Sequence, residues 1–262
     1  IEISDNAAGI SEENIEDALT YAKYRDIDRS QLNLSEFGVG MKNAAFKFSP
    51  KWHLITKALD EKIEKTYTFD LKNIKKNVKG LAPKITKKNV DSKLHYTSIV
   101  LENCYPEHFP NKRGKISDIK EHLKDVYRKY ISNDTAKIFL KKQELGKYKD
   151  EVLIDRYHEE FFKKEAKIIK WKKPFSIEAG INEVNGSPKK VEGWVGVRSR
   201  GKANTGGMPL FREGRMILGT GGKPHKPSQI YGSGGSTMGA LRLIGEMNLI
   251  NFGSSSIKNM AY

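Results

Sequence analysis

The stretch Ile1-Glu2-Ile3-Ser4-Asp5-Asn6-Ala7-Ala8-Gly9-Ile10 decides the fold of this chain. Its first four residues alternate apolar and polar side chains, which is typical of a half-buried strand. Asp5 follows at the strand's end, where its side chain can point into a crevice, and Gly9 permits close backbone approach. A buried carboxylate needs donors, and the exocyclic amine of adenine is one. An ordinary strand-turn-helix with a turn-forming Asp-Asn fits the same residues.

A helix is expected directly after this turn. Ser11 is a candidate N-cap, and Glu12 and Glu13 suit the positive end of a helix dipole. Apolar side chains then recur at helical spacing, at Ile15, Ala18, Leu19 and Ala22. The pattern predicts a helix over residues 12–24.

The second informative stretch is Phe37-Gly38-Val39-Gly40-Met41-Lys42, a glycine pair at the start of a predicted helix over residues 41–48. Helix N-termini expose unpaired N–H groups, glycines let a phosphate come close to them, and a following lysine adds a positive charge. A loop with a tight turn is the competing interpretation. The polar residues 24–36 before it fit a lid over a ligand or a plain surface loop.

A third element, Tyr96-Thr97-Ser98-Ile99-Val100-Leu101, is rich in β-branched residues and predicts a strand. Thr97 could hydrogen-bond Asp5 or an ordered water beside the base, although strand propensity alone also explains a threonine here. The remaining elements predicted in the first half are strands at residues 52–56 and 65–70 and a helix at residues 118–131.

Taken in this order, the Asp-Asn-x-x-Gly-Ile turn, the Phe-Gly-x-Gly-x-Lys turn and the threonine strand resemble the GHKL ATPase superfamily. That superfamily holds gyrase, the large heat-shock chaperones, histidine kinases and MutL. Residues 37–45 look most like the chaperone, MutL and MORC branch, and later segments resemble bacterial MORC-like ATP-binding proteins, at residues 114–131, 210–217, 230–232 and 242–246. The resemblance implies an α/β (α+β) two-layer sandwich of the GHKL (Bergerat) type, at residues 1–132, followed by a smaller α/β transducer-like domain, at residues 133–262.

The resemblance also implies ATP and Mg²⁺ as cofactors and assigns roles to single residues. Asp5 looks like the adenine-recognising aspartate, Gly9 like the glycine that makes room for the base, and Thr97 like the threonine that supports the contact. The phosphate-binding turn would comprise Phe37, Gly38, Val39, Gly40, Met41 and Lys42. Lys258 stands where this branch carries a lysine of the second domain that reaches the γ-phosphate, which makes it the candidate catalytic residue.

The chain departs from the family pattern at three places. Ala7 replaces the family's usual glycine, and the residues around Lys258 match loosely. The family's first motif, a helix with a general-base Glu and a Mg-binding Asn, is absent, because the chain begins with Ile1 inside the first strand. We therefore expect that helix upstream of Ile1, and we assign no catalytic base or metal ligand within this sequence.

Composition bounds the partners and the compartment. The formal net charge of +15 favours polyanionic partners, with DNA the leading one. Lysines cluster at residues 72–93, where Asp91 is the only acid, and at residues 163–173, although such runs also form plain solvated faces. Few aromatic residues interleave them, which gives no clear platform for single-strand stacking. The single Cys104 excludes an internal disulfide, and no apolar run is long enough to span a bilayer, so we expect a cytoplasmic protein.

These observations lead to one main functional expectation. The chain would be an ATP-binding and hydrolysing conformational switch that acts on or near DNA, in genome maintenance or phage defence, within a nucleotide-dependent homodimer or a larger complex. The alternative is a non-catalytic DNA-binding or scaffold module with a vestigial nucleotide pocket. A histidine kinase is a weaker alternative, because no upstream phospho-acceptor helix is found.

Overall fold

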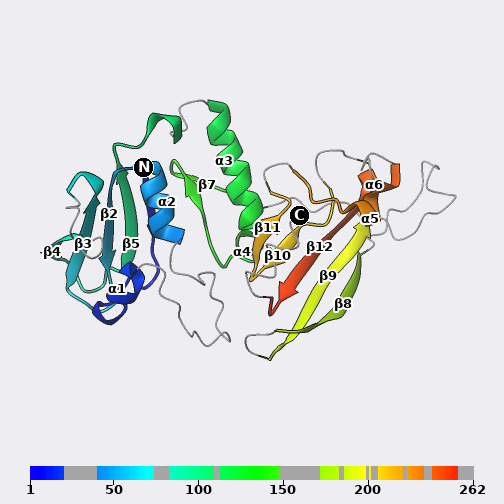
Figure 1. Ribbon diagram of the computed structural model, residues 1–262, viewed down its shortest axis with the longest axis horizontal. Helices are drawn as coiled ribbons and strands as arrows, with labels where there is room; N and C mark the ends of the chain where they lie inside the picture. Colours follow the sequence, from blue (N-terminus) through cyan, green and yellow to red (C-terminus); the bar gives the residue numbers. More distant parts are fainter. Residues whose placement is uncertain are drawn as a thin grey trace. The chain divides into compact units, whose positions relative to one another are not determined.

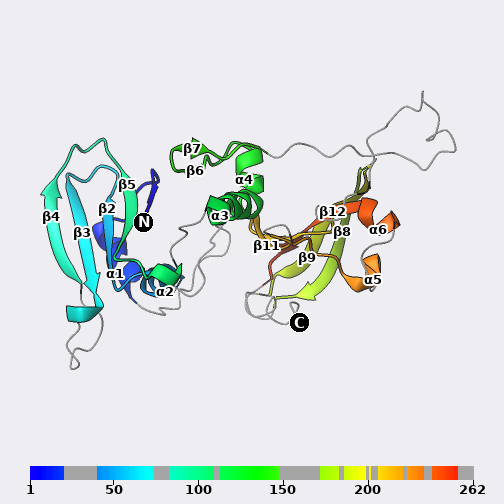
Figure 2. The same cartoon turned by 90° about the horizontal axis from the view of Figure 1, so that it is seen from above.

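The computed structural model describes residues 1–20, 40–73, 83–108, 113–147, 172–182, 186–198, 201, 206–220, 223–232 and 238–252. The chain divides into two compact units, Ile1–Asn111 and Lys112–Tyr262. The sequence analysis expected the boundary between the two domains after residue 132. The helices at Arg113–Val126 and Arg128–Ser132 therefore belong to the second unit and not to the first. The mixed α/β architecture expected from the sequence is confirmed (Figures 1 and 2).

The first unit is a five-stranded sheet covered on one face by two helices. The strand order is β1-β5-β2-β3-β4, and every neighbouring pair is antiparallel. The strands are β1 (Glu2–Asp5), β2 (Lys51–Lys57), β3 (Ile63–Asp70), β4 (Lys84–Asn89) and β5 (Tyr96–Glu102). The helices are α1 (Glu12–Leu19) and α2 (Gly40–Phe48), and single 3₁₀ turns follow β3 at η1 (Leu71–Asn73) and β5 at η2 (Pro106–His108).

The core of this unit lies between the helices and the sheet. Side chains alternate along β2, so Trp52 and Leu54 face the helices while His53 faces the other way. The Trp52 ring stacks on Phe69 with centroids 4.2 Å apart, and Phe46 from α2 meets both rings edge-on. The buried members of this core are Ile15, Ala45, Trp52, Leu54, Tyr67, Phe69 and Leu101. A two-layer sandwich results, because each layer can bury its apolar side only against the other.

Two helix boundaries differ from the sequence prediction. The helix expected over residues 12–24 ends at Leu19, because Thr20 adopts an extended conformation while its N–H and its hydroxyl both donate to the Glu16 carbonyl. The helix expected over residues 118–131 is instead two helices, α3 (Arg113–Val126) and α4 (Arg128–Ser132). They are separated at Tyr127, whose ψ of 15° lies outside the helical range.

The second unit has its own five-stranded sheet, in the order β11-β10-β12-β9-β8. Its strands are β8 (Lys172–Ile181), β9 (Pro188–Val197), β10 (Leu210–Arg212), β11 (Arg215–Leu218) and β12 (Leu243–Ile250). The pair β10–β12 is parallel and the other pairs are antiparallel. A short hairpin, β6 (Phe139–Leu140) and β7 (Gln143–Glu144), and two short helices, α5 (Ser228–Tyr231) and α6 (Met238–Arg242), complete the described part.

Helices of this unit contact the sheet through both apolar and charged side chains. Tyr231 of α5 and Ala240 of α6 pack with Met208 in a buried cluster. From α4, the Arg128 guanidinium lies 2.7 Å from the Glu246 carboxylate on β12 and 4.9 Å from the centroid of the Phe211 ring. Burial lowers the pKa of Arg128 despite this carboxylate, so the pair is held in a desolvated place.

Replacing Trp52 by alanine should destabilise the first unit strongly. The side chain has no exposed area and forms the stacked contact with Phe69, so we expect the free energy of unfolding to fall by about 3–5 kcal/mol. Urea denaturation followed by circular dichroism measures the change. As a control, Leu59→Ala removes a half-exposed side chain and should cost about 0.5 kcal/mol or less. Equal losses for the two variants would contradict this description of the core.

Stability of the second unit should fall at alkaline pH in a way that depends on Tyr231. Burial raises the pKa of the Tyr231 phenol to about 12, and its hydroxyl donates to the Leu243 carbonyl at 3.1 Å. The neutral phenol is favoured in the fold, so its contribution is complete below the unfolded pKa of about 10 and is lost as pH rises towards 12. Urea denaturation at about pH 8 and at about pH 11, on either side of the unfolded pKa, should show a larger loss for the wild type than for Tyr231→Phe. A larger loss for the variant would contradict the assignment.

Candidate functional site

A row of polar residues crosses the helix-covered face of the first sheet at one end. Asp5 on β1 is the cross-strand partner of Thr97, Thr97 of Thr56, and Thr56 of Lys65 on β3. Direct partners in antiparallel strands point to the same face, so these side chains lie on the side that carries the apolar core. We call Asp5, Thr97, Thr56 and Lys65 the polar row. Four strands thus bring together groups that are up to 92 residues apart in the chain.

Asp5 and Thr97, both singled out from the sequence, are neighbours in this row. The Asp5 carboxylate is exposed, and its Oδ1 accepts the N–H of Ala7 at 2.9 Å, so it fixes the local turn. The sequence placed this carboxylate in a crevice, whereas the structure leaves it open to solvent. A carboxylate has acceptor capacity for several donors, so this one contact leaves room for another.

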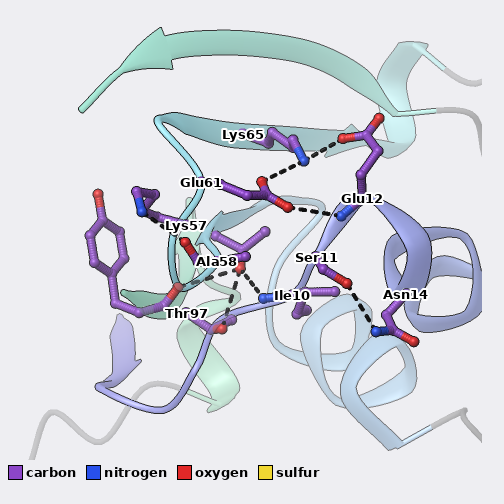
Figure 3. Close-up of polar contacts among 11 residues, drawn as sticks. Ile10, Ser11, Glu12, Asn14, Lys57, Ala58, Glu61, Lys65 and Thr97 are labelled. Carbon is purple, nitrogen blue, oxygen red and sulfur yellow. Dashed lines mark hydrogen bonds and ion pairs between the residues drawn. The ribbon is translucent and has the colours of Figure 1, made fainter. Parts of the chain in front are cut away.

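Thr56 is a member of the row that the sequence reasoning missed. Its side chain is within the buried interior, and its Oγ1 accepts the N–H of Ile10 at 2.8 Å. The same hydroxyl lies 3.3 Å from the Tyr96 carbonyl and 3.4 Å from the Thr97 hydroxyl, either of which can take its proton. Figure 3 shows Ile10 and Thr97 around this contact. The alternation of β2 could have revealed it, because Thr56 follows Trp52 and Leu54 on the buried face, where a hydroxyl needs partners.

Gly9 is required by the packing of the turn that follows β1. Its φ is +72°, and a Cβ atom there would lie 2.1 Å from the Lys57 carbonyl oxygen. Flanking contacts hold the same turn, because Leu59 N–H donates to the Ala8 carbonyl at 2.8 Å. The close approach expected of Gly9 is therefore made to the end of β2. Its role in making room for a base stays a prediction.

Lys65 ends the row as a buried lysine that is paired with two glutamates, of which Glu12 is exposed (Figure 3). The Lys65 Nζ contacts the carboxylate of Glu12 and lies 2.9 Å from the carboxylate of Glu61. Glu61 also accepts the backbone N–H of Glu12 at 3.2 Å. Burial opposes the charged form of Lys65, but its hydrogen bonds to Glu12 and Glu61 outweigh that effect and raise its pKa. The hydrogen bond from Lys65 also lowers the pKa of Glu12. The network ties the first turn of α1 to β3.

The structure describes half of the second predicted turn. Phe37, Gly38 and Val39 lie outside the described residues, and α2 begins at Gly40. Gly40 is exposed, and a Cβ atom there would meet nothing within 4 Å among the described residues. Packing against the described residues therefore does not explain a glycine at this position, in contrast to Gly9. The next residue, Met41, packs against the core of the first unit.

Lys42 takes a place that the sequence did not suggest. Its side chain is buried, and its ammonium donates to the carbonyls of Ala18 at 2.7 Å and Thr20 at 2.9 Å. These carbonyls lie at the C-terminal end of α1, where helices leave acceptors unpaired and attract cations. In this structure Lys42 therefore joins α2 to the end of α1. The contact with a phosphate that the sequence predicts for Lys42 stays a prediction.

Two other expectations concern catalysis. Lys258 lies outside the described residues. Within the described ranges no three His, Cys, Asp or Glu side chains are grouped so that they could hold a metal ion.

One family model matches this chain, over residues 1–100, and it is described as "Histidine kinase-, DNA gyrase B-, and HSP90-like ATPase". The matched segment contains the polar row, both predicted turns and most of β5. The first unit is thus similar to the ATPase domains of the GHKL superfamily over most of its length. The match does not extend into the second unit.

The solved structures to which this chain shows some similarity include two of the ATPase region of Saccharomyces cerevisiae topoisomerase II. One has 11% identity and a TM-score of 0.44, over 82% of this chain and 52% of that one. The other, bound to ICRF-187 (dexrazoxane), has 11% identity and a TM-score of 0.48, over 95% and 64%. The Aquifex aeolicus MutL ATPase domain complexed with ADP has 15% identity and a TM-score of 0.40, over 100% and 84%.

The chain spans about half the length of the first topoisomerase structure that it matches. Comparison with curated proteins gives no significant match. Among the helices that the structure describes, none combines the length and the apolar character needed to cross a membrane.

Replacing Thr56 should test how the row holds the turn. Thr56→Val keeps the side-chain shape but leaves the Ile10 N–H without its acceptor, so we expect a loss of about 1–3 kcal/mol in the free energy of unfolding. Thr56→Ser retains the hydroxyl and should lose less. Urea denaturation of both variants gives the comparison, and a serine variant that is less stable than the valine variant would contradict the role of the hydroxyl.

Proposed function

We propose that this chain binds ATP across the polar row and the N-terminus of α2, and that it hydrolyses ATP as a conformational switch. The observation that carries the proposal is the ATPase family match over residues 1–100, on a segment whose fold sets Asp5 beside Thr97. The exposed carboxylate with spare acceptor capacity supports it further.

At the base-binding end, the Asp5 carboxylate would accept the exocyclic amine of adenine. Thr97 stands next to it in the ladder and would hydrogen-bond the base or an ordered water. Thr56 and Gly9 would act indirectly, since they fix the turn from which Asp5 projects. A base that lacks this amine would leave the carboxylate without its hydrogen-bond donor. Sites built on such a hydrogen bond bind bases that lack the donor much more weakly.

At the phosphate end, the N-terminus of α2 would receive the phosphates. Unpaired N–H groups and the helix dipole favour anions there, and the absence of a side chain at Gly40 leaves space for one. Gly38 and Val39 would extend the same turn, as the sequence predicts. Lys42, which in this structure contacts the carbonyls at the end of α1, would add its positive charge to this turn.

The remaining parts of the proposal rest on the family resemblance. Lys258 would reach the γ-phosphate from the second unit and stabilise charge that develops during phosphoryl transfer. The catalytic base would precede Ile1, and the Mg²⁺ that the resemblance implies is given no ligand within this chain. A nucleotide-dependent homodimer or larger complex acting on DNA, in genome maintenance or phage defence, and membership of the MORC-like branch are our proposals for its biological setting.

Isothermal titration with a non-hydrolysable ATP analogue tests the site through Asp5→Asn. Asparagine keeps an oxygen that can accept the Ala7 N–H, so the turn survives while the charge is lost. We expect the affinity to fall roughly tenfold to a hundredfold, as the loss of a hydrogen bond to a charged group predicts. Asp91→Asn is the matched control, because the Asp91 carboxylate accepts the Lys93 N–H two residues on, at 3.0 Å, in the same kind of turn.

The outcomes separate the proposed function from its alternative. Unchanged affinity in Asp5→Asn, or an equal loss in Asp91→Asn, would remove Asp5 from the site. A wild-type chain that binds no ATP analogue but binds DNA would favour the non-catalytic scaffold module. Small-angle scattering with and without ATP then tests the switch, since we expect compaction in the wild type and less in Asp5→Asn.

A further inference from the structure

The two edges of the first sheet carry opposite charge. On β1, at one edge, the charged residues are Glu2 and Asp5, both exposed. On β4, at the other edge, they are Lys84, Lys87 and Lys88, and all six residues of the strand are exposed. Figures 1 and 2 show β4 at one edge of this sheet, and β1 belongs to the opposite edge. A polyanion would therefore be attracted to the β4 edge and repelled by the β1 edge.

The lysines of β4 are held in fixed places by its pairing with β3. Lys87 is the partner of Lys65 and so lies on the helix-covered side, while Lys84 and Lys88 are partners of Thr68 and Glu64 and lie on the other side. An anion that approaches the edge can therefore be contacted from both sides of the strand. Among the described residues none of these three lysines forms an ion pair, whereas Lys65 is occupied by Glu12 and Glu61.

Neighbouring segments add to this charge. Lys62 ends the turn before β3, and its carbonyl accepts the Val90 N–H just beyond β4, while Lys93 follows a few residues later. Both lysines are exposed. Asp91 is the only acidic residue within residues 84–93, and its carboxylate accepts a hydrogen bond from the Lys93 backbone N–H. The β4 edge, defined by Lys62, Lys84, Lys87, Lys88 and Lys93, is thus basic along its whole length.

The outer side of β4 also has no partner strand among the described residues. Backbone N–H groups on such an edge are donors, and phosphate oxygens accept from both lysine side chains and backbone amides. Lys84 and Lys88 are four residues apart, which is about 13 Å along a strand and about the rise of four base pairs. The spacing suits phosphates along one strand of a duplex.

We propose that the β4 edge binds the phosphate backbone of double-stranded DNA. The strand Lys84–Asn89 contains no aromatic residue on which an unpaired base could stack, so a duplex is favoured over a single strand. Contacts to phosphates alone carry no sequence information, so binding is independent of sequence. The inference gives the DNA association of the proposed function a surface, and it requires no nucleotide in the ATP site.

A competing explanation assigns these lysines a protective role. Lysine on an exposed edge prevents pairing with the edge of another molecule. The two explanations differ in what neutralisation does. Removal of a protective lysine promotes association of the chain with itself, whereas removal of a phosphate-binding lysine weakens DNA binding and its dependence on salt.

The test uses the full chain without nucleotide and a fluorescein-labelled DNA duplex, with anisotropy measured at several NaCl concentrations. Lys84→Gln, Lys87→Gln and Lys88→Gln are combined in one variant. We expect affinity to fall about tenfold or more, and the slope of log affinity against log salt to shrink by about two or three, roughly one for each phosphate that the variant no longer binds. The matched control combines Lys137→Gln, Lys141→Gln and Lys142→Gln, which removes the same charge from exposed residues around the β6–β7 hairpin.

Several results would overturn the proposal. These are an unchanged salt slope in the β4 variant, an equal change in the control, or a wild type that does not bind the duplex. Tighter binding to a single strand or to phosphatidylserine vesicles than to the duplex would assign the edge to another partner. Self-association of the variant with intact DNA binding would establish the protective role. Titration of both variants with the ATP analogue separates this outcome from failure of the ATP site, because neither triple change replaces a residue of the polar row.

Discussion

The close approach of Gly9 to the carbonyl of Lys57 is the constraint on which the candidate site depends. Only a residue without a side chain can come so near that carbonyl with positive φ. The approach brings the Ile10 amide onto the Thr56 hydroxyl and the Ala8 carbonyl onto Leu59. Because the turn is held at these points, β1 stays in register with β5 and Asp5 stays beside Thr97. The start of α1 follows from the same approach, and Lys65 secures it through Glu12.

The lysines of the first unit fall into two groups, one buried and one exposed, and the two groups have different roles. Lys42 and Lys57 are buried with their ammonium groups on backbone carbonyls, those of Ala18 and Thr20 for the first and of Ala58 and Ser92 for the second. A buried cation needs such partners, so these lysines serve the fold. The lysines of β4 are exposed and form no ion pair among the described residues. The excess positive charge of the chain is therefore partly structural and partly available to a polyanion.

In the second unit, strand β12 carries a desolvated ion pair on one face and apolar packing on the other. Glu246 of β12 meets Arg128 of α4, while the next residue, Met247, packs with Leu210 and Leu249. The alternation of side chains along a strand allows both within two residues. Its sheet also joins β10 to β12 in parallel across more than 30 residues, a pairing that local sequence patterns do not specify.

The sequence by itself determined the strands at residues 52–56 and 96–101, the tight turn at Gly9 and the helix at residues 41–48, because each depends on local periodicity, on β-branched composition or on the special freedom of glycine. The tertiary structure decided which groups meet. Thr56 finds Ile10 across 46 residues and Lys42 finds Ala18 across 24. It also added β4, whose polar sequence carries little strand signal and pairs with β3 through backbone groups. Hydrogen-bond partners of this kind are chosen by the packing of whole layers, which no local pattern encodes.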